Sequence, residues 1–277
     1  MTEPTLFPES GFRRLRLDLA YDGTNFFGWA KQPELRTVQE EIEKALSTIT
    51  RGAIDTVVAG RTDAGVHATG QVIHADVPDI FALEEIAYKL NRILDEDLRV
   101  LEVTTAPFGF HARFSALRRY YTYKILDSNK PILPLLRFDI APWYRPLDID
   151  AMNKSSEYLL GEHNFAAFCK YREGATTIRT LEHFSWERNS DGLLVADVIA
   201  DAFCYSMVRN LVGAVACVGD GRFPPSWVKE VLENQVRISD SMVFPARGLT
   251  FKQVDYPSDD QLLTRAEATI ARRGDED

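Results

Sequence analysis

Cysteine is scarce in this chain, and its three cysteines lie far apart in the sequence, at Cys169, Cys204 and Cys217. An odd number of cysteines without a short paired spacing indicates neither a disulfide framework nor a zinc knuckle. We therefore expect all three side chains to be reduced and mostly buried.

Long apolar runs are also missing, since none approaches the roughly 18 residues that a membrane-spanning helix needs. The N-terminus carries Glu3, Pro4 and Glu9 where a signal peptide would have basic and apolar regions. These absences predict a cytoplasmic protein without a membrane partner. The 277 residues, 45% of them hydrophobic, are enough for two compact units with sizeable cores.

The chain lacks a net positive charge, because its formal net charge is −9. Affinity for nucleic acid comes largely from basic groups that neutralise phosphates, so the total charge argues against an RNA partner. The distribution of charge along the chain weakens that argument, because the basic residues are clustered. Basic residues gather at Arg113, Arg118, Arg119 and Lys124, and again at Arg172, Arg179, Arg209, Arg222 and Arg247. If these residues share one cleft, an acidic chain can still bind RNA.

Hydrophobic periodicity predicts an α+β fold. The predicted strands are 14–21, 55–60, 71–77, 98–104, 118–126, 178–188, 192–200 and 248–254, and the predicted helices are 38–50, 83–94, 151–160, 206–218 and 225–234. A capping box of Thr37 and Glu40 begins the first helix, and Asn189-Ser190-Asp191 joins two strands in a hairpin. The element order predicts two fused ferredoxin-like α/β halves, each an antiparallel sheet backed by helices, with an active-site cleft between them.

One tight loop, Gly60 to Ala68, concentrates reactive side chains between two apolar strands. It holds one carboxylate, Asp63, with Arg61 two residues earlier and glycines on both sides of the turn. A guanidinium that close lowers the pKa of a carboxylate and orients it, which suits a nucleophile or a base. The alternative is an Asx-type turn in which Asp63 only bonds backbone amides, and such turns are common.

Tyr121 and Arg209 are further candidates. Tyr121 and Tyr123 share one face of a predicted strand, where aromatic side chains are more often core residues than contact residues. Arg209 lies in a predicted helix among apolar residues, and a buried guanidinium requires an acidic partner. Asp63 would supply that partner, and an ordinary structural ion pair with another acid is the alternative.

Two competing functions come from other classes. His67, His74, Asp63 and Asp76 invite comparison with a metal site, but their spacing is loose and no His-x-x-x-His or Cys-x-x-Cys pattern accompanies them. We expect no metal, and His74 to be a strand residue whose hydrogen bonds are satisfied. An RNA-binding module without chemistry is disfavoured, because binding phosphates needs no carboxylate.

Short motifs recur along the whole chain in a fixed order. Besides the Gly60–Ala68 loop they are Tyr21-Asp22-Gly23, Phe27-Gly28-Trp29, Phe110-His111-Ala112-Arg113, Arg119-Tyr120-Tyr121-Thr122-Tyr123, Met207-Val208-Arg209-Asn210 and Ala246-Arg247-Gly248-Leu249. Together they resemble the tRNA pseudouridine synthases of the TruA family. Tyr120 stands where some members have an arginine, which leaves the set of phosphate contacts open.

The resemblance implies an isomerase that converts uridines 38 to 40 of the tRNA anticodon arm to pseudouridine, with no cofactor and no metal. Asp63 would attack the ribose anomeric carbon or the uracil ring, or would remove a ribose proton. Arg209 would hold Asp63 ionised, and Tyr121 would stack on the uracil and assist proton transfer. Arg61 would brace the stack that the flipped uridine leaves.

The resemblance also implies the binding partners. His67 would contact the substrate, and phosphates would be held by Arg113, Arg118, Arg119 and Arg247. Members of the family are homodimers in which one tRNA spans both subunits, so tRNA and a second copy of the chain are the expected partners.

These interpretations divide the chain into four parts. Residues 1–11 would be a loose N-terminal arm, and residues 12–112 an α/β half that carries the Asp63 loop. Residues 113–256 would be a second α/β half that carries Tyr121 and Arg209. Residues 257–277 would be a polar tail, a frayed helix from Arg265 onward.

Overall fold

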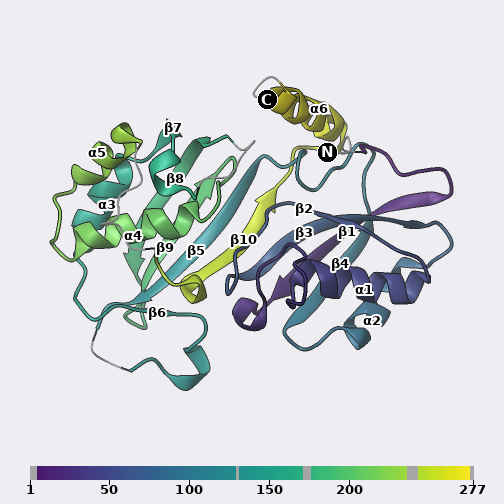
Figure 1. Ribbon diagram of the computed structural model, residues 1–277, viewed down its shortest axis with the longest axis horizontal. Helices are drawn as coiled ribbons and strands as arrows, with labels where there is room; N and C mark the ends of the chain where they lie inside the picture. The colour runs from purple at the N-terminus through teal and green to yellow at the C-terminus, as the bar shows by residue number, and fades with distance from the viewer. Residues whose placement is uncertain (1–4, 129–130, 171–175, 236–242, 275–277) are drawn as a thin grey trace. The chain divides into compact units, whose positions relative to one another are not determined.

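The computed structural model describes residues 5–128, 131–170, 176–235 and 243–274 (Figure 1). Strands and helices alternate through the chain, which confirms the predicted α+β class. The chain forms two compact units, one of Met1–Leu117 with Phe251–Asp277 and one of Arg118–Thr250. The predicted division at residues 112 and 256 differs from these units, since the segment from Phe251 onward belongs to the first. Within the described residues, no helix is both long and apolar enough to cross a bilayer.

The first unit follows the element order predicted for the first half. Its elements are β1 (Phe12–Tyr21), the 3-10 helix η1 (Gly23–Asn25), α1 (Val38–Thr50), β2 (Thr56–Val58), β3 (His67–Pro78), α2 (Leu83–Ile93), β4 (Leu98–Thr105), β10 (Leu249–Asp255) from Phe251 onward, η5 (Asp259–Gln261) and α6 (Leu262–Gly274). The strand order is β4-β1-β3-β10, and β2 also pairs with β3. Pairing of β3 with β1 and β2 is antiparallel, which places the loop between β2 and β3 at one end of this sheet.

Alternation in β1 decides which side chains reach the core of the first unit. Leu15, Leu17 and Leu19 are fully buried, as predicted, because successive side chains of a strand point to opposite faces. Arg14 is an exception, since it is buried on the other face and donates two 2.8 Å hydrogen bonds to the Asp76 carboxylate. Paired and hydrogen-bonded, this buried charge is tolerated.

The start of α1 corrects one prediction. Thr37 occupies the N-cap position, but its side chain makes no capping hydrogen bond, so the predicted capping box with Glu40 is wrong. The first helical amides instead donate to a distant loop, Val38 to the Gly28 carbonyl at 3.2 Å and the next residue to the Trp29 carbonyl at 3.0 Å. Tertiary contacts therefore satisfy the amides that a side-chain cap would have satisfied.

The C-terminal helix α6 corrects a second prediction. Leu262 and Ala266 are buried, and the Ser115 hydroxyl donates to the Leu262 carbonyl at 3.2 Å. A Cβ on Gly109 would stand 2.5 Å from Leu263 Cβ, so the helix lies tightly on this part of the first unit. The helix begins at Leu262, before the predicted Arg265, and buried Ala266 lies in the part that was predicted to fray.

The second unit contains the remaining elements. They are β5 (Arg118–Leu126), η2 (Pro134–Leu136), β6 (Ala141–Pro142), α3 (Ile149–Glu157), β7 (Gly161–Asn164), η3 (Ala166–Phe168), β8 (Ile178–Arg188), β9 (Leu194–Ala200), α4 (Met207–Gly219), α5 (Trp227–Asn234) and η4 (Ala246–Gly248). The strand order is β5-β9-β8-β7, and Figure 1 shows α3, α4 and α5 gathered beside these strands. The predicted hairpin is confirmed, because the Asn189 amide donates to the Leu193 carbonyl at 2.9 Å.

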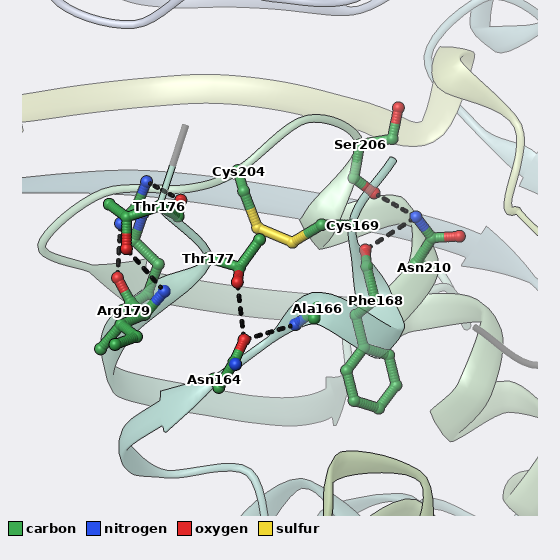
Figure 2. Close-up of a disulfide and its surroundings, with 11 residues drawn as sticks. Asn164, Ala166, Phe168, Cys169, Thr176, Thr177, Arg179, Cys204, Ser206 and Asn210 are labelled. Atoms are coloured by element: carbon green, nitrogen blue, oxygen red, sulfur yellow. Dashed lines mark hydrogen bonds between the residues drawn. A yellow bond between two sulfur atoms is a disulfide. The ribbon is translucent and has the colours of Figure 1, made fainter. Parts of the chain in front are cut away.

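The cysteines overturn the prediction that all three are reduced. Cys169 and Cys204 are joined by a disulfide, with their Cα atoms 5.8 Å apart (Figure 2). Cys217 is a buried thiol outside this disulfide. No short spacing indicates the pair in the sequence, because the two cysteines are 35 residues apart and meet only in the folded unit.

Candidate active site

Asp63 lies in a tight turn between β2 and β3 of the first unit. The Val66 amide donates to the main-chain carbonyl of Asp63 at 3.2 Å, and Gly65 adopts a φ of +77° that glycine reaches without strain. The main chain therefore closes this turn. The Asp63 carboxylate itself is half-buried.

A second loop, which contains Phe26, Gly28 and Trp29, holds the backbone on both sides of Asp63 by hydrogen bonds. The Trp29 amide donates to the Thr62 carbonyl at 3.0 Å, and the Gly65 amide donates to the Phe26 carbonyl at 3.2 Å. Gly28 sits between these bonds with a φ of +90°, and a Cβ there would lie 2.9 Å from the Thr62 carbonyl oxygen. Only glycine lets the two loops approach this closely.

A buried polar network holds the other side of the Asp63 loop. Gln71, fully buried within β3, donates through Nε2 to the Gly60 carbonyl at 2.8 Å and to the Tyr21 hydroxyl at 3.3 Å. The Tyr21 and Thr62 hydroxyls are 2.8 Å apart. Either of these two hydroxyls can be the donor. Burial raises the pKa of Tyr21 to about 12, so this hydroxyl keeps its proton at neutral pH.

Sequence reasoning missed Thr62 and Gln71 as supports of the site. A glutamine at the head of the apolar run Val72-Ile73 is a signal that could have identified one of them, because a buried amide needs hydrogen-bond partners. Its partners cannot be read from the sequence, since Tyr21 lies 50 residues away.

His67, predicted to bind substrate, is buried at the start of β3 and faces η1. Its Nδ1 atom lies 3.1 Å from the Gly23 amide nitrogen and 3.1 Å from the Asp22 carboxylate. One ring nitrogen cannot serve both at once: Nδ1 without a hydrogen accepts from the Gly23 amide, and Nδ1 that carries a hydrogen donates to the Asp22 carboxylate. Burial opposes ionisation of Asp22, but hydrogen bonds from Thr24 and the nearby His67 lower its pKa overall. The histidine thus links the Asp63 loop to η1.

Tyr121 lies on the buried face of β5 in the second unit. Arg119, Tyr121 and Tyr123 share that face while Tyr120 is half-buried, as the alternation predicted. The Tyr121 ring meets the Phe203 ring edge-on, with the ring centroids 5.1 Å apart. The position of the Tyr121 ring therefore depends on the loop that precedes α4.

Arg209, in the first turn of α4, is tied to the segment before η4. Its Nε donates to the Phe244 carbonyl at 2.7 Å, and the Phe244 amide donates back to the Arg209 carbonyl at 3.2 Å. The Tyr123 hydroxyl donates to the Pro245 carbonyl at 2.6 Å. Burial raises the pKa of Tyr123, although the positive charges of Arg209 and Arg247 oppose the rise. The structure thus brings Arg209 and Arg247 together around Tyr123.

The other predicted arginines differ in exposure. Arg61 and Arg113 are exposed on the first unit, where the Arg113 guanidinium lies 5.5 Å from the Phe114 ring centroid. Arg119 is buried and donates to the Asp201 carbonyl at 2.6 Å. Arg118 lies 3.0 Å from the Glu182 carboxylate. Arg172, counted with the basic residues, lies outside the described residues.

The histidines bear on the competing metal hypothesis. Within the described part of the chain, no group of three or more His, Cys, Asp or Glu side chains is arranged to hold a metal ion. His74 Nδ1 accepts the Ala112 amide at 3.0 Å, which confirms a satisfied strand residue. Its ring lies 4.7 Å from that of buried His111, whose Nδ1 accepts the Phe114 amide at 3.1 Å. Burial and the Arg14 charge lower the pKa of both, that of His111 to about 4.

These two histidines predict that the protein loses stability in mild acid. The unfolded chain binds their protons below a pKa of about 6.5, whereas the folded chain does not until about 4 for His111. The contribution of these two histidines to the free energy of unfolding is therefore fully present above about pH 6.5. Below that pH it falls by about 1.4 kcal/mol per pH unit for each histidine. Urea unfolding at pH 7 and pH 5 should differ by roughly 2–4 kcal/mol.

A conservative variant isolates this effect. His111→Asn keeps an acceptor near the Phe114 amide and removes one titrating base, so it should reduce the pH dependence by about half. His183→Gln, at an exposed position on β8, should leave the pH dependence unchanged. An equal free energy of unfolding of the wild-type protein at pH 7 and pH 5 would contradict the lowered pKa of His74 and His111.

Known proteins resemble this chain along most of its length. Residues 19–115 and 156–257 match a family model described as tRNA pseudouridine synthase. A protein from Frankia casuarinae named tRNA pseudouridine synthase A is 54% identical, covering 95% of this chain and 96% of that protein. Proteins of the same name from Streptomyces griseus and Mycobacterium leprae are 52% and 45% identical, covering 93% and 97% of this chain and 93% and 98% of those proteins.

The matches cover the candidate residues unevenly. The first matched segment contains Asp63 and Arg113, and the second contains Arg209 and Arg247, whereas Tyr121 falls between the two. Among solved structures, a dye-decolorizing protein from V. cholerae aligns over 94% of this chain and 98% of that chain with 12% identity. Its TM-score of 0.20 is too low to support a conclusion.

Proposed function

The chain belongs to the tRNA pseudouridine synthase A family, and on that premise we propose that it isomerises uridines 38, 39 and 40 in the anticodon stem-loop of tRNA. The reaction breaks the N-glycosidic bond of uridine and rejoins the same base to the ribose through carbon. No atom is gained and no electron is transferred, so the chemistry calls for no redox cofactor. The observation that carries the proposal is the half-buried Asp63, on a turn whose backbone is fixed by two sets of hydrogen bonds.

Site-resolved chemistry tests the proposal directly. A tRNA transcript incubated with the protein, then treated with a carbodiimide and with alkali, should stop reverse transcription directly 3′ of uridines 38 to 40. Stops elsewhere in the tRNA would contradict the position assignment. Absence of every stop, with tRNA bound, would favour a binding module without chemistry.

We assign the chemistry to three side chains. Asp63 acts as the nucleophile on the anomeric carbon or the uracil ring, or as the base that removes a ribose proton. Arg209 supplies positive charge to the reaction, which is the role that the family resemblance gives it. Tyr121, whose ring is held by Phe203, stacks on the uracil and assists the final proton transfer.

The target uridine must leave the stacked stem before Asp63 can act on it. Arg61 is exposed two residues before Asp63, which supports a role in filling or bracing the vacated stack. Unpairing costs a few kcal/mol, and contacts of this kind offset that cost. His67, buried beside η1, contributes by holding the loop that meets the substrate.

The basic residues are proposed to bind phosphates. Exposed Arg113 and half-buried Arg247 have the exposure that direct contact needs, whereas buried Arg119 and the ion-paired Arg118 act by shaping the surface around them. The positive charges of accessible arginines let a chain with a net charge of −9 bind tRNA, because local charge and not the total attracts the phosphates.

This assignment predicts a steep salt dependence of tRNA binding. Each neutralised phosphate contributes about −0.7 to −0.9 to the slope of log affinity against log salt, so the two direct contacts of Arg113 and Arg247 give a slope of about −1.6. Affinity should then fall roughly 9-fold between 50 and 200 mM salt. Arg113→Gln should reduce the slope by about 1, whereas Arg51→Gln, an equal charge change at another exposed position, should not. A flat salt dependence of the wild-type protein would overturn the assignment.

We further propose that the protein acts as a cytoplasmic homodimer, as its family resemblance implies, and that each half has a ferredoxin-like arrangement. The order β1, α1, β2, β3, α2, β4 supports that arrangement for the first unit. Exposed apolar side chains in the segment 133–138 support an interface between copies, since Leu135 is 94% exposed. Sedimentation should give a dimer for the wild-type protein and a monomer for Leu135→Asp, and a wild-type monomer would refute the proposal.

A further inference from the structure

The disulfide joins two segments of the second unit, one of which leads into the helix that carries Arg209. Cys169 directly follows η3 and is 4% exposed, whereas Cys204 is half-buried in the loop of residues 201–206 that leads into α4 (Figure 2). We call residues 201–206 the α4-entry loop. The Cα atoms of the pair are 5.8 Å apart, within the range that disulfides span.

Contacts other than the disulfide hold the same two segments together. The Lys170 amide donates to the Tyr205 carbonyl at 3.0 Å. Asn210 Nδ2 donates to the Phe168 carbonyl and to the Ser206 carbonyl, each at 2.9 Å (Figure 2). Because these bonds do not involve sulfur, the two cysteines stay close when both are reduced. The pair is therefore pre-arranged to close again.

The α4-entry loop also positions side chains to which the proposed function gives roles. Phe203 packs edge-on against Tyr121, and Arg119 donates to the Asp201 carbonyl at 2.6 Å. The loop ends at Ser206, and α4 then begins with Met207 and carries Arg209 in its first turn. A bond that restrains this loop thus restrains the surroundings of Tyr121 and the start of α4.

We propose that Cys169 and Cys204 form a reversible thiol–disulfide site that reacts with low-molecular-weight disulfides. When the pair is oxidised, the bond locks the α4-entry loop onto Cys169 and Lys170, which follow η3. Protein disulfides are rare in the cytoplasm, where thiol systems reduce them, so a pair that closes there closes under oxidising conditions. Cys217 is fully buried in α4 and takes no part.

The reaction proceeds in two exchange steps. The thiolate of Cys204, the more exposed of the pair, attacks one sulfur of the small disulfide RSSR, and the departing RS⁻ takes up the proton that Cys204 released. Cys169 then attacks the Cys204 sulfur in the mixed disulfide and displaces the second RSH. Two protein thiols are oxidised to one disulfide and one RSSR is reduced to two RSH, with no net change in protons.

Mass spectrometry of the full-length protein tests the site without reference to activity. Protein treated with oxidised glutathione, then denatured and alkylated with N-ethylmaleimide, should carry one adduct, because only one of its three cysteines remains a thiol. Protein treated with dithiothreitol should carry three. Three adducts after oxidation, or a cross-linked peptide that contains Cys217, would overturn the proposal.

Variants test the order of the steps. Cys169→Ser should stop the reaction at the mixed disulfide and retain one glutathione on Cys204, whereas Cys217→Ala should still form the Cys169–Cys204 disulfide. Glutathione absent from the first variant would contradict attack by Cys204. If the first variant does not fold, Cys204→Ser serves instead, since its buried Cys169 should remain unmodified.

The melting temperature and the activity of oxidised and reduced protein show what the Cys169–Cys204 disulfide does to the protein. Oxidised protein should melt about 5–10 °C higher than reduced protein, because the bond closes a loop of 35 residues. An equal melting temperature would refute the lock. The activity readout rests on the proposed function: the oxidised enzyme should retain pseudouridine formation longer at elevated temperature. A protein that forms the disulfide but modifies no tRNA would contradict the proposed function and leave the thiol site intact.

Discussion

Replacing Asp63 with asparagine is expected to abolish pseudouridine formation while leaving the affinity for tRNA nearly unchanged. Asparagine has the shape of aspartate but cannot act as a nucleophile or a base, so kcat should fall by roughly 10⁴-fold or more. The turn around Asp63 is closed by main-chain hydrogen bonds, so the loop should keep its conformation. Single-turnover kinetics and filter binding on the same tRNA measure the two quantities separately.

Asp55→Asn is the matched control for this variant. Asp55 is fully exposed in the first unit, so the same loss of one negative charge should leave both turnover and binding unchanged. If Asp63→Asn lost tRNA affinity in proportion to activity, the loop would have a structural role rather than a chemical one. Substantial residual turnover would transfer the nucleophile role to another residue.

Replacing Gly28 with alanine is the second change with a large expected effect. The new Cβ would lie 2.9 Å from the Thr62 carbonyl and 3.2 Å from Asp63 C, at a φ of +90° that alanine adopts only under strain. The protein should lose about 1–3 kcal/mol of stability. Displacement of the Asp63 backbone should lower kcat by about 10²-fold, because catalysis depends on placement within about 1 Å. Urea unfolding and steady-state kinetics measure the two effects.

Gly52→Ala controls for the change of residue type. Gly52 is exposed in the same unit, and a Cβ there would meet nothing within 4 Å, so its stability and its activity should both stay near wild type. Wild-type kcat in Gly28→Ala would show that the close approach of the two loops does not position Asp63. A loss of stability alone would lead to the same conclusion.

The fold was predictable where local pattern and tertiary packing agree. The leucines of β1 and the aromatics of β5 alternate in the sequence as they do in the structure, because one face of each strand is buried. β7 (Gly161–Asn164) was missed because four residues are too few to show a period. The capping box of Thr37 failed because carbonyls from another loop satisfy the helix amides.

The candidate site was predictable only in part. A carboxylate between glycines, beside an arginine, makes Asp63 a candidate without any coordinates. The network of Tyr21, Thr62 and Gln71 could not be found in this way, because its hydrogen bonds join residues 41 and 50 positions apart. The disulfide was missed for the same reason, since each cysteine taken alone indicates only a buried thiol.

Tritium release from uracil-5-tritiated tRNA tests the central claim most directly. Joining the ribose to carbon 5 of the uracil displaces the hydrogen at that position, so each pseudouridine formed releases one tritium. The account predicts release by the purified wild-type protein in excess chelator and no release by Asp63→Asn. Absence of release from a wild-type protein that binds tRNA, or release that returns only when a metal ion is added, would contradict it.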